Sequence, residues 1–403
     1  MPALLEPFSA DLQPQLLPAG DVEALYVHVP FCFHKCHYCD FYSITRQTPE
    51  RMRRYVDLVL READRWTEDA EGPTAKPRTI FFGGGTPTLL PVAEMRRLIL
   101  GLRKRFDFTA TNEFTVEANP ATLSDEFAAM LREVGVDRLS FGAQSFDRDE
   151  LKTLERHHDP DDVPRSLDIA RRAGFSRLNL DLIYAIPGQT LERWADNLQR
   201  AIALGTPHLS CYGLTYESNT PIAVKKRLGT MIPVEESLEL EMLRYTRRRL
   251  GEVGRPAYEI SNYAIAGEEC RHNLVYWTGG NYVGLGPSAA SHVQGWRWKN
   301  RPHLGEWEQA IEAERLPAAD VEQLTPDQRA GELAMLMLRL SDGLNFDDFA
   351  GRSGRDARQM FARQIDQLAP PGLITVDDRG VRLTDRGLSV ADAVSAEFLA
   401  IAR

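Results

Sequence analysis

The chain has 403 residues, of which 43% are hydrophobic and 26% are charged, as in ordinary globular proteins with one large domain and one or two smaller ones. Its net charge of −10 argues against a general electrostatic grip on nucleic acid. We see neither a basic secretory leader nor a run of about 18 apolar residues, so we expect a cytoplasmic protein without a membrane span.

Six short apolar segments alternate with amphipathic helical segments in the first half of the chain. The predicted strands cover residues 24–29, 78–83, 112–118, 138–143, 177–184 and 208–214. Helical segments such as 51–66, 92–106 and 123–135 lie between them. This alternation predicts βα units and a parallel sheet. Six units favour an α/β fold with an incomplete parallel (β/α)6 barrel, and an open doubly wound sheet is the alternative.

The pattern changes along the chain and predicts four segments. We expect a lead segment at 1–20, the barrel at 21–265, an irregular, site-lining segment at 266–325 and a separate domain at 326–403. The last of these contains two helical stretches followed by a hairpin-like segment at 372–388. That order of elements predicts a winged-helix-like C-terminal domain.

Three of the five cysteines fall within eight positions. Cys32, Cys36 and Cys39 form a CxxxCxxC pattern just after the first predicted strand. Three thiolates on one short loop can hold three irons of a cubane and leave the fourth iron open. A zinc site completed by His34 or His37 is the alternative, although zinc ligands more often come as two separated pairs.

Polar residues follow the ends of the next strands. The second strand ends in Gly83-Gly84-Gly85-Thr86, the third in Glu117 and the fourth in Gln144, and the fifth contains Asp181. Carboxyl ends of parallel strands are where β/α proteins assemble their sites. A carboxylate inside an apolar strand needs partners, which a bound ligand or neighbouring loops can supply.

The cysteine pattern and the glycine segment together resemble the radical S-adenosylmethionine (SAM) superfamily. That resemblance implies a [4Fe–4S] cluster on Cys32, Cys36 and Cys39, with SAM bound to the open iron. By motif position it implies that Tyr26 and Tyr38 flank the SAM methionine. The further implied SAM contacts are Gly84, Gly85, Thr86, Glu117, Gln144, Arg156 and Asp181.

Longer segments resemble the anaerobic coproporphyrinogen-III oxidase family. They include CHYCDFYS, IFFGGGTPTLL, FTVEANP, RLSFGAQSF and LNLDLIYAIPGQT, in family order. Within that family two features favour a heme chaperone over the decarboxylase of porphyrin biosynthesis. The decarboxylase has another cysteine where this chain has Phe41, and it has a longer segment before the cluster.

A further motif concerns heme. Residues 270–277 read CRHNLVYW and resemble the HNxxYW motif linked with heme binding in these chaperones. His272 could ligate iron, and Tyr276 and Trp277 could face a porphyrin. Loop packing by the same residues is the alternative, and Cys270 is a competing ligand. Cys211 lies within the sixth predicted strand and is expected to be a buried core thiol.

Three hypotheses follow for function. The favoured one is a heme chaperone that passes heme to an acceptor protein, with no catalytic residue assigned. The second is oxygen-independent decarboxylation of coproporphyrinogen III, and the third is a nucleic-acid-binding regulator, which we set aside. Implied partners of the chaperone are heme, the acceptor, a reductant such as flavodoxin or ferredoxin, membrane respiratory complexes and a second copy in a dimer.

Overall fold

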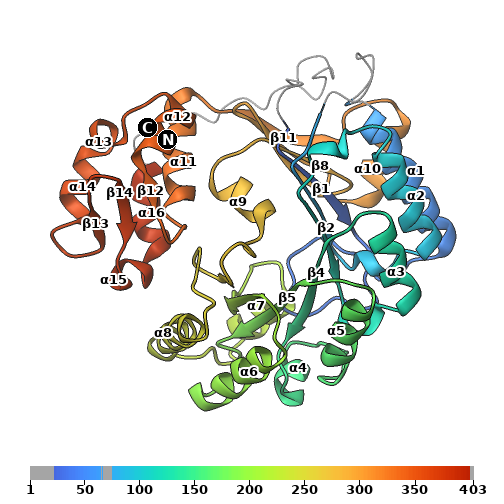
Figure 1. The fold of residues 1–403 in the computed structure, drawn as a ribbon, viewed down its shortest axis with the longest axis horizontal. Helices are drawn as coiled ribbons and strands as arrows, with labels where there is room; N and C mark the ends of the chain where they lie inside the picture. The colour runs from blue at the N-terminus through green and yellow to red at the C-terminus, as the bar shows by residue number, and fades with distance from the viewer. Residues whose placement is uncertain (1–21, 65, 67–74, 400–403) are drawn as a thin grey trace.

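The computed structural model describes residues 22–64, 66 and 75–399, so the expected lead segment at 1–20 lies outside the described residues. A curved sheet of eleven strands dominates this part of the chain, and helices cover its outer face (Figure 1). A smaller helical domain lies beside the open side of the sheet.

The six predicted strands are confirmed, and each differs from its predicted bounds by at most one residue. They pair in chain order, all parallel, which is the pairing that βα units produce. They are β1 (Ala24–Val29), β2 (Thr79–Gly84), β3 (Glu113–Ala118), β4 (Arg138–Gln144), β5 (Arg177–Tyr184) and β6 (His208–Gly213).

One helix or helix pair follows each of the first five strands. Polar caps mark where several of them begin: Ser124 accepts a hydrogen bond from the backbone of Phe127, and Thr190 accepts one from Arg193. The helices are α1 (Pro49–Asp64), α2 (Val92–Leu102), α3 (Asp125–Glu133), α4 (Arg148–Thr153), α5 (Asp162–Arg172) and α6 (Leu191–Ala203). Short 3-10 turns lie at Pro87–Leu89, Phe108–Ala110 and Pro120–Thr122.

After β6 the chain extends the sheet at both of its edges. Strand β7 (Asn262–Ala264) pairs antiparallel with β6, after helices α7 (Pro221–Arg227) and α8 (Glu236–Glu252). Strand β8 (Tyr282–Leu285) returns to the other edge and pairs parallel with β1. Strands β9 (Ala290–Val293), β10 (Trp296–Asn300) and β11 (Ala318–Gln323) continue from β8 by antiparallel pairing. Strands β7 and β11 are the two edges of the sheet and do not pair with each other. The barrel is therefore incomplete, as predicted.

The expectation that residues 266–325 are irregular is wrong. This segment contains strands β8 to β11 together with helices α9 (Arg271–Trp277) and α10 (Leu304–Glu312). The strands are short and glycine-interrupted, which hid their alternation in the sequence. One of these glycines is required by close packing, since a Cβ at Gly284 would lie 2.3 Å from the carbonyl oxygen of Ala290.

The C-terminal domain has its own apolar core, which includes Leu333, Phe349, Phe361 and Phe398. It contains the predicted helices followed by a hairpin, and a third short strand joins that hairpin. Its elements are α11 (Pro326–Met337), β12 (Leu344–Asn345), α12 (Phe346–Ser353), α13 (Ala357–Met360), α14 (Ala362–Leu368), β13 (Ile374–Val376), β14 (Gly380–Leu383), α15 (Asp385–Leu388) and α16 (Ala391–Leu399).

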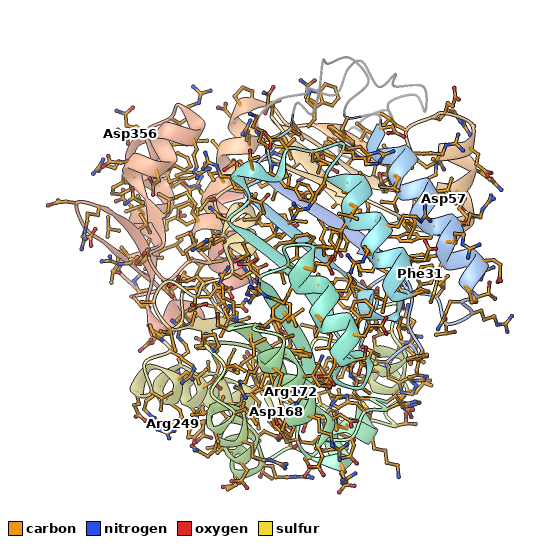
Figure 2. All side chains as sticks on the ribbon, turned by 45° about the vertical axis from the view of Figure 1, so that its right-hand side comes forward. Phe31, Asp57, Asp168, Arg172, Arg249 and Asp356 are labelled. Atoms are coloured by element: carbon orange, nitrogen blue, oxygen red, sulfur yellow. The ribbon has the colours of Figure 1, made fainter. Side chains whose placement is uncertain are left out.

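The main core lies between the sheet and its outer helices. Phe31 is fully buried there, whereas Asp57 on α1 and Arg172 on α5 are exposed on the outer surface (Figure 2). No helix in the described part of the chain is long and apolar enough to cross a membrane.

Candidate functional site

The cysteine loop connects β1 to α1 at the carboxyl-terminal end of the strands. Its base is closed by two backbone bonds, from Cys32 to the carbonyl of Ile44 (3.0 Å) and from Ile44 to the carbonyl of Pro30 (2.7 Å). A turn within the loop joins the amide of Cys39 to the carbonyl of Cys36 at 3.2 Å. The three predicted cysteines therefore lie on one short loop whose two ends are fixed to each other.

Polar groups from later strands reach two of these thiols. Thr86 Oγ1 lies 3.7 Å from Cys32 Sγ, and Arg156 Nη1 donates to Cys36 Sγ at 3.6 Å. Burial raises the pKa of the Cys32 thiol, and it raises the pKa of Cys39 to about 11. Three thiols with a nearby guanidinium are a donor set that fits three irons of a cubane and offsets the negative charge of its thiolates.

The other two cysteines lie away from this loop. Cys211 is buried in β6, and Cys270 precedes α9, where its thiol donates to Glu113 Oε1 at 3.5 Å. Burial raises the pKa of both thiols. Among the described residues, the cysteine loop is therefore the one place where three cysteines lie together.

The glycine segment at the end of β2 lies against the base of the cysteine loop. The amides of Gly85 and Thr86 donate to the carbonyls of Val29 and Phe31 at 2.8 and 2.7 Å. A Cβ at Gly85 would lie 2.7 Å from both carbonyl oxygens. Gly84 has a φ of 101°, which disfavours any residue with a side chain. A Cβ at Gly84 would also lie 2.4 Å from the His28 ring, so both glycines are required by close packing against β1 and the base of the cysteine loop.

Two carboxylates face this end of the barrel. Glu117 Oε2 accepts a hydrogen bond from the amide of Gly84 at 3.2 Å, while Asp181 accepts from Asn179 (2.7 Å) and Ser140 (3.3 Å). Burial, followed by the charge of Asp181, raises the pKa of Glu117 to about 8. Burial also raises the pKa of Asp181. A ligand with hydroxyl or amino donors would supply the partners that Glu117 lacks.

Arg156 is held between the cysteine loop and β4. Its Nη2 donates to the carbonyl of Gly142 at 2.8 Å and its Nε to His158 at 3.2 Å. Gln144 ends the strand with a φ of 64°, and a Cβ at Gly142 would meet both the Gln144 amide and the Arg156 guanidinium. Arg156 is therefore not the solvated helix-end arginine that its sequence position alone would suggest.

The two tyrosines assigned to SAM lie on different elements. Tyr26 projects from β1, where it stacks on Phe81 (6.3 Å between ring centroids) and contacts His28 Nδ1 at 3.2 Å. Tyr38 lies on the cysteine loop, close enough to Arg156 and Asp181 for their charges to influence its pKa, which burial raises. Both are half-buried, and their role toward SAM stays a prediction.

The HNxxYW segment lies at the opposite end of the strands. It forms α9, which contains His272. The backbone amide of His272 donates to Glu113 Oε1 at 2.9 Å, and its ring Nδ1 is hydrogen-bonded to Thr79 Oγ1 at 2.9 Å. Thr79 and Glu113 are the first residues of β2 and β3. His272 Nε2 is bonded to the hydroxyl of Tyr276 at 2.8 Å.

His272 is therefore buried with both ring nitrogens occupied. It is 1% exposed, and burial lowers its pKa to about 3, so the ring is neutral. Trp277 packs against the C-terminal domain, with the guanidinium of Arg339 5.0 Å from the ring centroid. Heme ligation by His272 would require one of its two hydrogen bonds to break, and it stays a prediction.

Sequence reasoning missed several residues that shape the cysteine loop. Lys225 of α7 lies 3.1 Å from His37 Nδ1, and His28 Nε2 bonds to the carbonyl of Tyr42 at 2.8 Å. Lys225 comes 188 residues after its partner and belongs to no motif, so no local signal in the sequence indicated it.

Comparison with known proteins agrees with this arrangement. The model of the radical SAM superfamily matches residues 26–201, and that of the HemN C-terminal domain matches residues 324–390. Proteins named heme chaperone HemW are 32% identical in Lactococcus lactis (93% of this chain, 96% of that protein) and 34% identical in Bacillus subtilis (94% and 99%). The chain belongs to the HemW family.

Further relatives extend this result. The Escherichia coli heme chaperone HemW is 38% identical over 67% of this chain and 70% of its own length. The solved structure of E. coli coproporphyrinogen III oxidase (HemN) has a TM-score of 0.82 at 24% identity, covering 96% of this chain and 92% of that chain, and so shows the same fold. The match of residues 26–201 to the radical SAM superfamily model implies a [4Fe–4S] cluster and SAM.

Proposed function

We propose that this protein is a heme chaperone that binds heme and transfers it to an acceptor protein, while carrying a [4Fe–4S] cluster with exchangeable SAM. The observation that carries the proposal is its similarity to proteins named heme chaperone HemW along nearly their whole length. A likeness to HemN at 24% identity concerns the fold alone.

The residues at the cysteine loop support the cofactor part of the proposal. Cys32, Cys36 and Cys39 would hold the cluster, with Arg156 offsetting the charge at Cys36. When bound, the cluster supplies an open iron to which the methionine end of SAM can attach. Gly84 and Gly85 pack closely against His28 and the carbonyls of Val29 and Phe31, and we assign their backbone to SAM beside the loop.

The side chains of the carboxyl-terminal end would hold the rest of SAM. Glu117 and Asp181 would accept hydrogen bonds from hydroxyl or amino groups, and the Gln144 amide and the Arg156 guanidinium both lie beside Gly142. Tyr26, Tyr38 and Thr86 complete the set that we assign to SAM. An exposed Phe41 stands where the decarboxylase has its further cysteine, which favours the chaperone.

Heme is the cargo, and His272, Tyr276 and Trp277 are its proposed contacts. Because His272 is enclosed, heme binding there would have to displace Tyr276 or Thr79. An acceptor protein, a flavodoxin- or ferredoxin-like reductant, transient contact with membrane respiratory complexes, a dimer and a cytoplasmic location stay predictions.

One divided sample tests the proposal. The full chain is reconstituted anaerobically, and one half is titrated with heme while the other receives coproporphyrinogen III, SAM and reductant. We expect stoichiometric heme binding without formation of protoporphyrinogen. Turnover without heme binding would overturn the proposal in favour of the decarboxylase.

Two variants then locate the heme. We expect His272→Ala to weaken heme retention, whereas His303→Ala, which removes an exposed histidine, should leave it unchanged. Unchanged retention in the His272→Ala protein would move the ligand elsewhere.

A further inference from the structure

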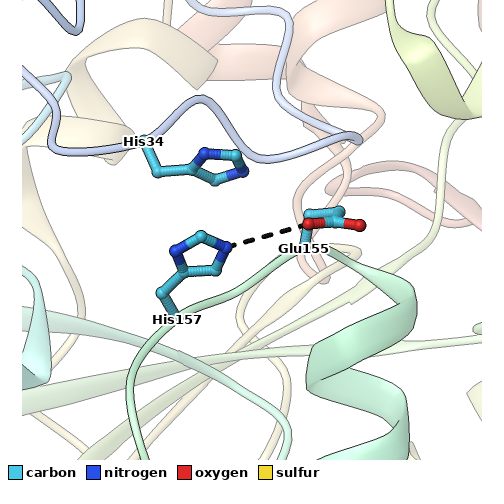
Figure 3. A group of neighbouring side chains, drawn as sticks. All are labelled: His34, Glu155 and His157. Carbon is cyan, nitrogen blue, oxygen red and sulfur yellow. Dashed lines mark ion pairs between the residues drawn. The ribbon is translucent and has the colours of Figure 1, made fainter.

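A second group of metal-ligating side chains lies beside the cysteine loop, outside the set assigned to the cluster. His34 belongs to the loop, and Glu155 and His157 belong to the connection that follows α4 (Figure 3). One ligand atom from each of the three lies within 4.8 Å of the others. Figure 3 shows the His34 ring facing that of His157, and the Glu155 carboxylate pointing toward His157.

The three side chains of this group contact one another without forming a good hydrogen bond. The two imidazole rings are nearly parallel, at 15°, with centroids 4.1 Å apart. His157 Nε2 lies 3.7 Å from Glu155 Oε2, which is longer than a good hydrogen bond. His34 Nε2 is buried and has no hydrogen-bond partner among the described residues. A buried polar atom without a partner destabilises the fold unless something absent from the chain satisfies it.

The donor set has a definite chemistry. Two imidazole nitrogens and one carboxylate oxygen are the ligands that proteins use for Zn²⁺ and Fe²⁺ in sites with open positions. We propose that His34, Glu155 and His157 bind one divalent transition-metal ion of the zinc type, at a site distinct from the three cysteines.

Binding needs the donor atoms to approach and one ring to rotate, because the two imidazole planes are now stacked and their nitrogen lone pairs do not converge. Bonds of about 2.0–2.1 Å would require the three donor atoms to approach to roughly 3.3 Å. His157 can move toward the others because its side chain is 63% exposed. Glu155 has a φ of 53°, an unfavourable conformation for a residue with a side chain, and conformations of this kind concentrate at functional sites.

The surroundings leave space for the remaining ligands of the ion. Glu155 and His157 border a cleft of about 340 Å³, also lined by Arg148, Lys152 and Asp159. Water or a small anion entering from the cleft would complete the coordination shell. The nearby cations do not capture Glu155, because Arg148 is paired with Asp159 and no ion pair joins Glu155 to a lysine or an arginine in the described part of the chain.

An ion at this site would join two segments that meet at Cys36. His34 lies between Cys32 and Cys36, and Glu155 and His157 flank Arg156, which donates to Cys36 Sγ. The ion would therefore tie the cysteine loop to the segment that carries its arginine. This role does not depend on whether the protein carries heme.

Zinc binding to the cluster-loaded protein tests the proposal. The full chain is reconstituted anaerobically, assayed for iron and sulfide, and dialysed against micromolar Zn²⁺ before metal analysis. We expect one zinc per chain in addition to the cluster iron. His157→Ala and Glu155→Gln should weaken zinc binding at least about tenfold, whereas the matched variant His303→Ala should not change it.

Zinc X-ray absorption separates this site from the cysteines. We expect nitrogen and oxygen neighbours at about 2.0–2.1 Å with an imidazole signature. Sulfur neighbours at about 2.3 Å would mean that zinc had entered the cysteine loop, and would overturn the proposal. Excess zinc that is retained equally by the His157→Ala protein would overturn it as well, and so would the absence of bound zinc in the unmodified chain.

Discussion

The two ends of the barrel use polar residues in opposite ways. At the carboxyl-terminal end Glu117, Asp181 and Arg156 are half-buried, and Glu117 has a single hydrogen bond. At the amino-terminal end Glu113 and His272 are buried, and every polar atom named there has a partner within the chain. The groups of the first arrangement can form further hydrogen bonds to a ligand. The groups of the second arrangement are already bonded within the chain and hold α9 in place.

This difference bears on two motifs that sequence alone treats alike. Both the CxxxCxxC loop and HNxxYW suggest binding of a cofactor or cargo. The structure places the cysteines among partly unsatisfied groups, and it places His272 in a closed network. Ligand binding at His272 therefore has to break a hydrogen bond to Thr79 or Tyr276, although Trp277 Nε1 of the same motif is buried without a hydrogen-bond partner among the described residues.

The largest expected effect concerns the open end. Cys36→Ala removes one of the three proposed cluster ligands, together with the acceptor of the Arg156 hydrogen bond. We expect the iron–sulfur absorption to be lost after anaerobic reconstitution. Cys211→Ala, which removes a thiol buried in β6, should retain the spectrum. A full [4Fe–4S] spectrum in the Cys36→Ala protein would refute the cluster assignment.

At the closed end, His272→Ala should act first on stability. The substitution leaves the Thr79 and Tyr276 hydroxyls without their partner and opens a cavity, so we expect a loss of about 2–4 kcal/mol in the free energy of unfolding. Urea unfolding measures this loss, and the cluster absorption should not change. If stability is unaffected, the network around α9 is not a structural one.

A third prediction uses the raised pKa of Glu117. Its carboxyl keeps a proton up to about pH 8 in the folded protein, whereas the unfolded chain releases it near 4.5. The folded state then binds more protons between these values, so its stability falls as pH rises from about 4.5 to 8. In SAM-free protein, Glu117→Gln should remove this dependence. The gain in stability of the variant over the unmodified protein should therefore be larger at pH 8.5 than at pH 6.

The expected size of that change is at least about 1 kcal/mol, the equivalent of one unit of pKa. Thermal unfolding of both proteins across the pH range measures it. Parallel pH profiles for the two proteins would show that Glu117 is ionised at neutral pH, and would remove the contrast drawn here between the two ends.

The smallest effect is expected where α9 meets the C-terminal domain. The guanidinium of Arg339 lies over the ring of Trp277, and such contacts contribute about 0.5–1 kcal/mol. A double-mutant cycle with Arg339→Met and Trp277→Leu should give a coupling energy in that range. A coupling energy of zero would mean that the domain packs on α9 without a specific contact.

Most of the barrel could be predicted because its signals are local. The strands at 24–29 and 177–184 match β1 and β5 residue for residue, since β1 is a nearly continuous apolar run and β5 alternates leucines with polar residues. The cysteine spacing is equally local. Strand β8 was missed because it has four residues and is defined by pairing with β1, some 258 residues earlier, for which the sequence has no local pattern.

The sequence indicated candidate residues for the site but not how they are arranged. Motif positions led to Glu117, Asp181 and Arg156, yet the hydrogen bond from Arg156 to Cys36 spans 120 residues. The sequence of α9 predicts a site-lining segment, with loop packing as the alternative, and the packing of His272 on Thr79 shows that this histidine is buried. The sequence did not indicate that His157 lies near His34, because the two residues are on different loops.

The pairing of β1 also fixes an order of events during synthesis. The cysteine loop directly follows β1, but β1 is flanked by β2 on one side and by β8 on the other. Arg156 and Lys225, which reach the loop, are made 120 and 188 residues after their partners. Contacts this distant in sequence form slowly and late in folding. The cysteines therefore emerge from the ribosome long before their pocket exists, and for that interval they are thiols open to oxidation or to the wrong metal.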